Sequence, residues 1–533
     1  MSSQQAPPSS FFRRQIGGFD SDALAAWWPA AIVLLIAAFV RSYIWLNSDV
    51  SWLLTLAEQV IGGARAYVDF REPNPPASIL LYMPAVLFGQ IAHISAESAL
   101  TLLVFAGVLL CLWLVDRILP DGALVASRER PVLLALGCAI LLILPGDNFA
   151  ERENIALIAI LPMLAAYVAR ARGITVSTAL SISAGIGGGI AVAIKPYFAL
   201  ALILPLPYAI WGWRSHRRKL TEAIFWREHL ASALVVLLYG AAVLWSFPDY
   251  VRETLPLVLT LYVPLRYSLF LMIINTSVVL VAMTMIVALG VGMREFRSPA
   301  VGVGFLAVLG FTGALVIQGK GWPYHGYPAV ALSLLVLALL LVRRLSVVRD
   351  KSHAARSASI DLAFGAVLFA CIYAVASYWL LQELDRSALV TAVSRIAPAH
   401  PKIVSISATP GIAFPLTRKL HGILVSRAPF QWISAYADRL LTAGTLDPDA
   451  NNRIGDAILR RTIEDYARVD RVELADSIRT GRPDVILIGG AMEHRWAFAH
   501  PELTLVLQPY RRAETFEGIE IWLPRTAPKP APH

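Results

Sequence analysis

Eleven apolar runs limit the folds open to this chain more than any other feature of its sequence. Hydrophobic residues make up 57% of the 533 positions and charged residues only 16%, which is more apolar surface than a water-soluble fold can bury. A helix needs about 20 residues to cross a bilayer, and most of these runs approach that length, so we expect a polytopic α-helical membrane protein with about 11 transmembrane helices. The expected spans are residues 26–46, 98–115, 132–146, 154–169, 178–194, 198–213, 231–247, 268–292, 299–317, 326–342 and 360–382.

A further apolar run, residues 77–95, differs from the others. It follows Pro76 and contains Pro84, Gly89 and His93, which make it a poor membrane span. If it lies in the membrane interface, the loops rich in Arg and Lys all fall on one side, as cytoplasmic loops do. We therefore expect an interfacial helix at 77–95. The basic loops then placed in the cytoplasm hold Arg13, Arg14, Arg117, Arg128, Arg130, Arg170, Arg172, Arg214, Arg217, Arg218, Lys219, Arg294, Arg297, Arg343, Arg344, Arg349 and Lys351.

These basic loops also explain the net charge of +9, so nucleic-acid binding is not expected. Cys111, Cys138 and Cys371 all lie within apolar runs. No cysteine is then left outside the membrane for a disulfide or a zinc–thiolate site. The outer side collects acidic residues and isolated cations instead, and we expect the chemistry there.

The first outer loop, residues 47–97, carries the densest group of charges. Apolar residues recur at helical spacing over 50–61, and Gly62-Gly63 then ends the expected helix, which we interpret as amphipathic and lying along the bilayer. Asp49 stands where the first span leaves the membrane. A carboxylate there can act as a general base that takes a proton from an acceptor hydroxyl. The alternative is that Asp49 caps the helix, since Asp is a favoured N-cap residue.

Three further carboxylates are candidates to orient acceptor hydroxyls or to hold a divalent cation: Asp69, Glu72 and Glu151. For Asp69 and Glu72 the alternative is ion pairing with Arg65 and Arg71 in the same loop. For Glu151 the alternative is a place in the first turn of a helix, where an acidic side chain complements the helix dipole.

Four basic side chains on the outer side suit the phosphate of a donor: Arg152, Lys195, Lys320 and His325. The alternatives are a helix-start charge pattern for Arg152 and lysines that snorkel to the interface. The glycines at 185–189 lack the Gly-Lys-Ser/Thr of a nucleotide-binding loop, so we expect no nucleotide site there.

Aromatic side chains accompany these cations. Trp322 and Tyr324 lie in the string Gln-Gly-Lys-Gly-Trp-Pro-Tyr-His at 318–325, and Tyr197 follows Lys195 and Pro196. All three are candidates for stacking on a sugar or a lipid. The alternative is an aromatic belt at the membrane interface.

The composition changes after residue 383. We predict a transmembrane catalytic domain over 1–383 and a small soluble α/β domain over 384–525 on the outer face, followed by a disordered Pro-rich tail at 526–533. Within the soluble domain, apolar runs predict strands at 403–407, 485–488, 503–507 and 519–523, and amphipathic patterns predict helices at 430–441 and 456–466.

Taken together, these residues resemble the GT-C superfamily of membrane glycosyltransferases that use polyprenyl-phosphate sugars. Its members include protein O-mannosyltransferases and the lipid A aminoarabinose and galacturonic acid transferases. The resemblance is carried by Asp49 after the first span, by the amphipathic helix at 51–61, and by Asn74-Pro75-Pro76 opening the segment 77–95. Mannosyltransferases typically have Asp-Glu at the first position, whereas Val50 follows Asp49 here, which points to the bacterial branches.

The resemblance implies a transferase of the bacterial inner membrane with its active site and C-terminal domain on the periplasmic side. It would move a sugar from a polyprenyl-phosphate donor to a lipid, glycan or protein acceptor, with Asp49 as the general base, without a nucleotide and with no certain cofactor beyond a possible divalent cation. A polysaccharide ligase or polymerase is the nearer alternative function. A transporter is the more distant one, because transporters place ionisable residues at mid-membrane, whereas these spans are nearly free of charge.

Overall fold

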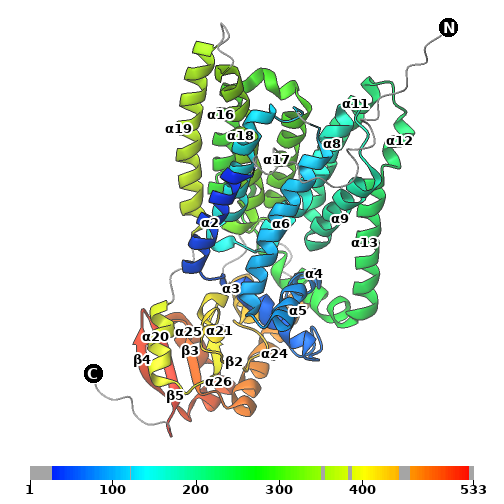
Figure 1. The fold of residues 1–533 in the computed structure, drawn as a ribbon. Coiled ribbons are helices and arrows are strands. Elements are labelled where there is room, and N and C mark those ends of the chain that lie inside the picture. Colours follow the sequence, from blue (N-terminus) through cyan, green and yellow to red (C-terminus); the bar gives the residue numbers. More distant parts are fainter. Residues whose placement is uncertain (1–26, 121, 350–354, 382–386, 443–455, 527–533) are drawn as a thin grey trace, which may run out of the picture.

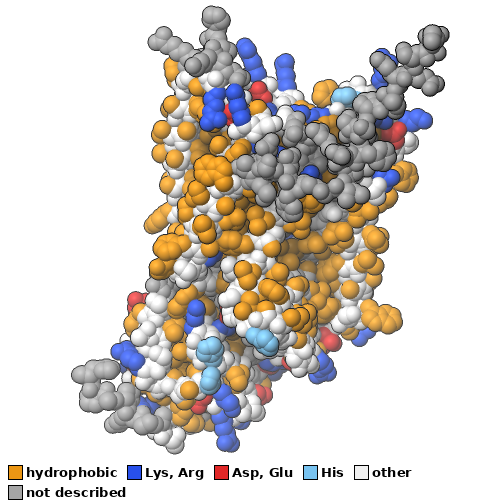
Figure 2. Space-filling model, in the orientation of Figure 1, with side chains coloured by type: hydrophobic (Ala, Val, Ile, Leu, Met, Phe, Trp, Pro, Cys, Tyr) orange, Lys and Arg blue, Asp and Glu red, His pale blue; other side chains and the backbone are white. Residues whose placement is uncertain are grey.

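A long helical bundle and a smaller α/β unit at one end of it make up the protein (Figure 1). The computed structural model describes residues 27–120, 122–349, 355–381, 387–442 and 456–526. The predicted disordered tail and the N-terminal segment before residue 27 thus lie outside the described residues. On the face shown in Figure 2, hydrophobic side chains cover the middle of the bundle, and Lys and Arg gather toward its two ends. This is the surface of a protein that spans a membrane several times.

Each of the expected spans corresponds to a helical segment. Within the described residues, eight helical stretches are long and apolar enough to cross a membrane, or nine if a bent pair is counted as one span. The remaining expected spans are shorter helices. The segments are α2 (Trp28–Tyr43), α6 (Ala96–Ile118), α7 with its π-helical extension η2 (Arg130–Cys138, Ala139–Ile143), α8 (Arg152–Ala171), α9 (Thr178–Ile194), η4 with α10 and α11 (Pro196–Ala199, Leu200–Ile203, Leu206–Ser215), α12 with α13 (Leu220–Ile224, Arg227–Ser246), α16 (Thr276–Gly292), α17 (Pro299–Gln318), α18 (Pro323–Arg349) and α19 (Ala355–Leu380).

Helix α8 forms the centre of the bundle. In its most apolar stretch 83% of the residues are buried inside the protein, against 17% in the corresponding stretch of α19 at the edge of the bundle. Helices α9, α17 and α18 pack against α8. Such a central helix presents its first turn to the interior, so charged residues at its N-terminus must find partners inside the protein.

The first outer loop turns sharply away from the bundle. Helix α3 (Ser48–Ile61) makes an angle of 84° with α2 and ends at Gly62. Gly63 follows at a φ of 100°, in the region that favours glycine. The segment 77–95 forms two short helices, α4 (Ala77–Leu80) and α5 (Met83–Ala92), and α5 packs on α6. The expected helices of this loop are therefore present.

The α/β unit contains one five-stranded sheet in the order β2-β1-β3-β5-β4. Strands β2, β1 and β3 are parallel, and β5 and β4 add to β3 as an antiparallel hairpin. The strands are β1 (Lys402–Ile406), β2 (Ile423–Leu424), β3 (Val485–Ile488), β4 (Tyr510–Phe516) and β5 (Ile519–Pro524), and the helices are α20 (Ser387–Ile396), α21 (Leu416–Lys419), α22 (Trp432–Thr442), α24 (Ala457–Gly481), α25 (Ala491–Ala499) and α26 (Pro501–Leu507).

Three of the four predicted strands coincide with β1, β3 and β5, but the one at 503–507 is wrong. That segment belongs to α26, in which Leu503, Val506 and Leu507 are buried and Leu505 is exposed. The spacing of i, i+3 and i+4 is helical, and Pro501 suits the first turn of a helix. A short apolar run does not by itself distinguish the two structures.

Charged contacts fasten the α/β unit to the first outer loop. The guanidinium of Arg418 donates to both carboxylate oxygens of Glu58 on α3 at 2.7 and 2.9 Å, and to Glu97 at the start of α6 at 2.6 Å. In a second contact Arg71 and Arg427 share the carboxylate of Glu473, each at 2.6 Å. The α/β unit therefore sits directly on the loop that carries Asp49.

We predict that Arg418→Gln weakens this attachment. Removing the guanidinium leaves two carboxylates without their shared cation, and we expect a loss of stability on the order of 1–2 kcal/mol, because both acids are partly exposed. The thermal melting midpoint in detergent and the rate of proteolytic release of the α/β unit would measure it. Arg460→Gln, which breaks an exposed pair with Glu464 within α24, is the matched control. Equal effects of the two substitutions would contradict the attachment.

Candidate active site

A cavity of about 410 Å³ lies where the first outer loop, the N-terminus of α8, the α17–α18 connection and the α/β unit meet. Most of the residues singled out in the sequence line it. They are Asp49, Glu72, Glu151, Arg152, Lys195, Trp322, Tyr324 and His325, together with Asn47, Trp52, Asn148, Tyr262, Thr409, Pro410, Phe430, Trp432 and Tyr436 among others.

Asp49 lies in the first turn of α3 and is not its N-cap. The cap is Asn47, whose side-chain oxygen accepts a hydrogen bond from the amide of Val50 at 2.8 Å. The Asp49 side chain is 29% exposed, and one of its oxygens lies 3.4 Å from Nη2 of Arg152. Burial raises the pKa of Asp49, and the charge of Arg152 opposes that rise. The result is a carboxylate at the cavity wall with a higher affinity for protons than an exposed Asp.

The start of α8 presents three consecutive buried ionisable side chains, Glu151, Arg152 and Glu153. Asn47 Nδ2 donates to Oε1 of Glu151 at 2.6 Å, so the residue that caps α3 also ties it to α8. Arg152 is 2% exposed and lies between Asp49 and Glu151. This arrangement holds the Asp49 turn against the start of the central helix.

Glu153 does not itself line the cavity, but it contacts two residues that do. Glu153 forms an ion pair with Lys195, which follows α9, and lies 3.7 Å from Nε2 of His325. Lys195 also donates to Oε1 of Gln318, at the end of α17, at 3.0 Å. Burial lowers the pKa of Lys195, and the charge of Glu153 opposes that shift. Arg152 and Lys195 are therefore brought to one cavity, as expected for residues that face the same ligand.

Glu72 lines the cavity with both of its oxygens engaged. Oε2 accepts from the indole of Trp52 at 2.7 Å, and Oε1 accepts from the backbone and side-chain nitrogens of Asn74 at 2.8 and 2.5 Å. The expected alternative, a pair with Arg71, is not formed, since Arg71 contacts Glu473 and Glu253 instead. Glu72 thus links α3 to the Asn-Pro-Pro segment.

Aromatic side chains from both parts of the protein complete the wall. Trp322 and Tyr324 lie with ring centroids 5.6 Å apart, and Tyr262 lies 6.2 Å from Trp322. Tyr436 on α22 of the α/β unit is 5.7 Å from Tyr262. Rings of this kind suit the faces of a sugar.

Three expected site residues lie elsewhere, and these are corrections to the expected site. Asp69 accepts from the backbone nitrogen of Arg65 at 2.7 Å and pairs with its side chain, as the alternative predicted. Tyr197 is 41% exposed and does not line the cavity. Lys320 turns into a smaller adjoining cavity. Local contacts explain two of them: Arg65 engages the carboxylate of Asp69, and the backbone carbonyls of Tyr262 and Leu265 hold the ammonium of Lys320.

Several residues of the site were not expected from the sequence. Asn47 had a local signal, because Asn before a helix is a common cap, but Asp49 competed for that role. Tyr262, Thr409, Phe430 and Tyr436 had none, since only the packing of distant segments brings them here. Among the described residues, no group of three or more His, Cys, Asp and Glu side chains is placed to hold a metal ion.

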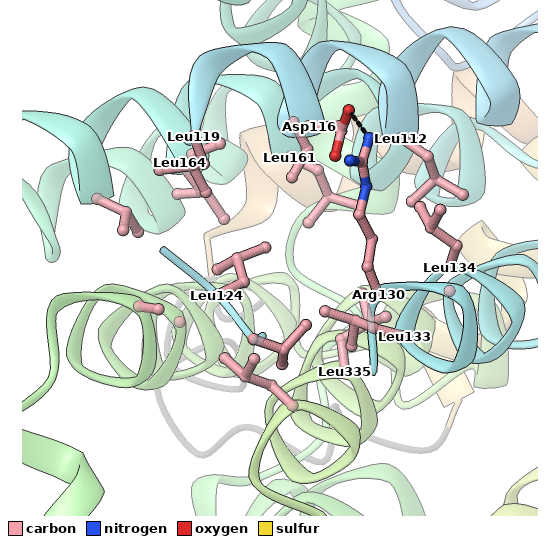
Figure 3. A pocket seen from close by; sticks show the side chains of 18 of the residues that line it. Leu112, Asp116, Leu119, Leu124, Arg130, Leu133, Leu134, Leu161, Leu164 and Leu335 are labelled. Carbon is pink, nitrogen blue, oxygen red and sulfur yellow. Dashed lines mark hydrogen bonds and ion pairs between the residues drawn. The ribbon is translucent and has the colours of Figure 1, made fainter. Parts of the chain in front are cut away.

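Another pocket lies between the helices, around the C-terminal half of α6 (Figure 3). Its wall is mostly apolar, with leucines such as Leu112, Leu124 and Leu335, and the ion pair of Asp116 and Arg130 crosses one side. With a single ion pair on an apolar wall, it lacks the converging polar groups of the first cavity.

Comparison with known proteins gives a structural match and no sequence match. No protein-family model matches the chain, and no curated protein matches it. The crystal structure of ArnT from Cupriavidus metallidurans bound to undecaprenyl phosphate superposes with a TM-score of 0.54 at 13% identity, over 97% of this chain and 100% of that one. The chain has the ArnT fold. The expected fold class, a polytopic helical membrane protein with a C-terminal α/β domain, is thereby confirmed.

We predict that Glu151 makes stability fall as the pH rises. Burial raises the pKa of Glu151 to about 8, above that of the unfolded chain. The protonated Glu151 side chain then stabilises the folded protein fully below pH about 4.3, which is the pKa of a glutamate in the unfolded chain. This stabilisation is lost as the pH rises through about 8. Melting midpoints between pH 5 and pH 9 should fall less steeply for Glu151→Gln than for the wild type.

Glu464→Gln on the exposed face of α24 is the matched control and should keep the wild-type pH dependence. An unchanged slope in Glu151→Gln would contradict the prediction.

Proposed function

We propose that this protein is a polyprenyl-phosphate-dependent glycosyltransferase that acts at the membrane surface on the side of the α/β unit. The observation that supports this most is the position of Asp49. Its carboxylate faces a cavity that also contains Arg152 and Lys195 and is walled by aromatic rings. The shared fold adds support, because ArnT was crystallised with undecaprenyl phosphate.

In the proposed reaction an acceptor hydroxyl attacks the anomeric carbon of the sugar. Asp49 takes the proton of that hydroxyl, and its raised pKa suits a group that must hold a proton near neutral pH. The bond between the anomeric carbon and the phosphate oxygen breaks, and the polyprenyl phosphate leaves with the electron pair. Arg152 and Lys195 stabilise the charge that develops on the leaving phosphate, with His325 beside them.

We propose roles for the remaining expected residues that line the cavity. Trp322 and Tyr324 offer ring faces for the sugar, and Glu151 and Glu72 border the space for the acceptor. The acceptor is a lipid, a glycan or a protein, and a divalent cation remains a proposed optional component.

We predict that Asp49→Asn abolishes most of the transfer while the protein stays folded. Asn keeps the size and the hydrogen-bonding capacity of the side chain but cannot accept a proton at neutral pH, so turnover should fall about 100-fold or more. Release of polyprenyl phosphate from a panel of polyprenyl-phosphate sugars, and the melting midpoint of the same preparation, would measure both effects.

Asp69→Asn is the matched control, because Asp69 lies in the same loop and outside the cavity. It should leave turnover near the wild-type value. Full turnover in Asp49→Asn would show that Asp49 is not the base.

We also propose that the protein resides in a bacterial inner membrane with the cavity and the α/β unit in the periplasm. The basic loops at the other end of the bundle support this orientation.

Cysteine labelling tests this orientation. In a Cys371→Ser background the remaining cysteines, Cys111 and Cys138, are buried. A membrane-impermeant maleimide should then label Thr480→Cys in intact spheroplasts, and should label Arg217→Cys only after the membrane is broken. The reverse pattern would contradict the orientation.

A further inference from the structure

The apolar cavity around the C-terminal half of α6 is separate from the candidate active site. Its volume is about 190 Å³, and the two cavities share no lining residue. On α8, Leu164 lines the apolar cavity and stands 12 positions after Arg152, which is roughly 18 Å along the helix axis. A ligand held in the apolar cavity therefore does not contact the residues of the proposed transfer.

Helices α6, α7, α8, α17 and α18 form the wall of this cavity. Leucine side chains from several of these helices surround one space in Figure 3, with the pair of Asp116 and Arg130 at its edge. Of residues 325–342 on α18, all but Leu335 are buried, and Leu335 lines the cavity. Protein interiors contain few voids larger than a water molecule, so this cavity interrupts the otherwise close packing of α18.

The wall of the cavity suits an apolar ligand. A buried water molecule needs two to four polar partners, whereas most of the lining side chains are aliphatic and Asp116 and Arg130 pair with each other. Apolar cavities of about 150 Å³ in other proteins stay dry and take up apolar molecules. Inside a bilayer, the apolar groups available to such a cavity are the acyl chains of lipids.

The connection between α6 and α7 gives access to the cavity. Pro120, Gly122 and Ser127 line the cavity there and are exposed. Arg128, which follows Ser127, is exposed as well, as is Arg117 near the end of α6. An acyl chain that enters at this connection leaves its headgroup among basic side chains at the membrane surface, and such side chains attract anionic lipids.

We propose that this cavity binds one acyl chain of an anionic phospholipid, whose headgroup lies at the α6–α7 connection. The apolar wall selects the chain, and Arg117 and Arg128 select the charge of the headgroup. The proposal goes beyond the transfer reaction, because this lipid is neither the donor nor the acceptor. Its chain completes the packing of α6, α7 and α18 around the central helix α8.

Photolabelling of the full-length protein tests this proposal. The protein would be reconstituted into phosphatidylcholine vesicles that contain a small fraction of phosphatidylglycerol with a diazirine near the end of one acyl chain. Mass spectrometry would then locate the labelled residues. We expect label on residues 332–339 of α18, saturating as the phosphatidylglycerol fraction rises. Because this stretch is buried except at Leu335, which faces the cavity, the lipid that surrounds the protein does not reach it.

A cavity-filling substitution gives the second measurement. Ala165 lines the cavity from α8 and is 5% exposed. The ring of Ala165→Phe should occupy the space of the chain and reduce the label on residues 332–339 about 10-fold or more, since a close-packed interior does not hold both. Ala241→Phe, at an exposed position of α13 outside the cavity, is the matched control and should label as the wild type does. If Ala165→Phe fails to fold, Leu335→Phe fills the same cavity from α18 and should lower the label likewise.

The headgroup is tested with phosphatidylcholine that carries the same diazirine chain. At an equal fraction it should label residues 332–339 about 5-fold less than phosphatidylglycerol does, as expected for the loss of one contact between an anionic lipid and a basic side chain.

The proposal is overturned if the label falls only on outer helices such as α13 and α19, or if the two lipids label residues 332–339 equally. It is also overturned if folded Ala165→Phe labels these residues as the wild type does, or if Ala241→Phe loses the label to the same extent. Because no sugar transfer is measured, this experiment and the transfer assay of Asp49→Asn can fail independently.

Discussion

Burial of charge at the N-terminus of α8 is the constraint on which the site depends. An ionised group removed from water is costly unless another charge or a hydrogen bond compensates it. Glu151, Arg152 and Glu153 are all buried at the start of the most buried helix of the bundle. Their partners come from other segments: Asn47 and Asp49 from the start of α3 contact Glu151 and Arg152, and Lys195 from the end of α9 pairs with Glu153. The charges therefore hold these segments together and, in doing so, form the wall of the cavity.

The α/β unit is part of the site as well as a neighbour of it. Arg418 and Arg427 fasten it to the first outer loop, and Phe430 and Tyr436 then reach the cavity. The site therefore needs the two parts of the chain to be correctly placed relative to each other.

The separation of charge between the two cavities has a chemical consequence. Carboxylates and cations alternate around Asp49, so that cavity can hold and release a proton as well as face a phosphate. The smaller cavity beside it is lined by the basic side chains of Arg266, Lys320 and Arg439 and, among its described lining residues, by no carboxylate. The same aromatic rings, Trp322 and Tyr436, lie between the two. One extended ligand, or two ligands side by side, can thus contact both.

The sequence by itself determined the class of protein, the helical segments and much of the site. Apolar runs of membrane-spanning length predict the transmembrane helices directly. Asp49, Glu72 and the Glu-Arg-Glu run at 151–153 could be identified as candidates because charged residues are rare in such a chain. Only the tertiary structure decided which charges share a cavity: it excluded Asp69, turned Lys320 aside, and made Asn47 the cap in place of Asp49. It also brought in residues from 409 to 436, whose approach to the bundle depends on contacts between segments more than 300 positions apart, such as that of Arg418 with Glu58. Local sequence patterns cannot predict such contacts, because a contact between distant segments stabilises the protein only after both segments have folded and come together.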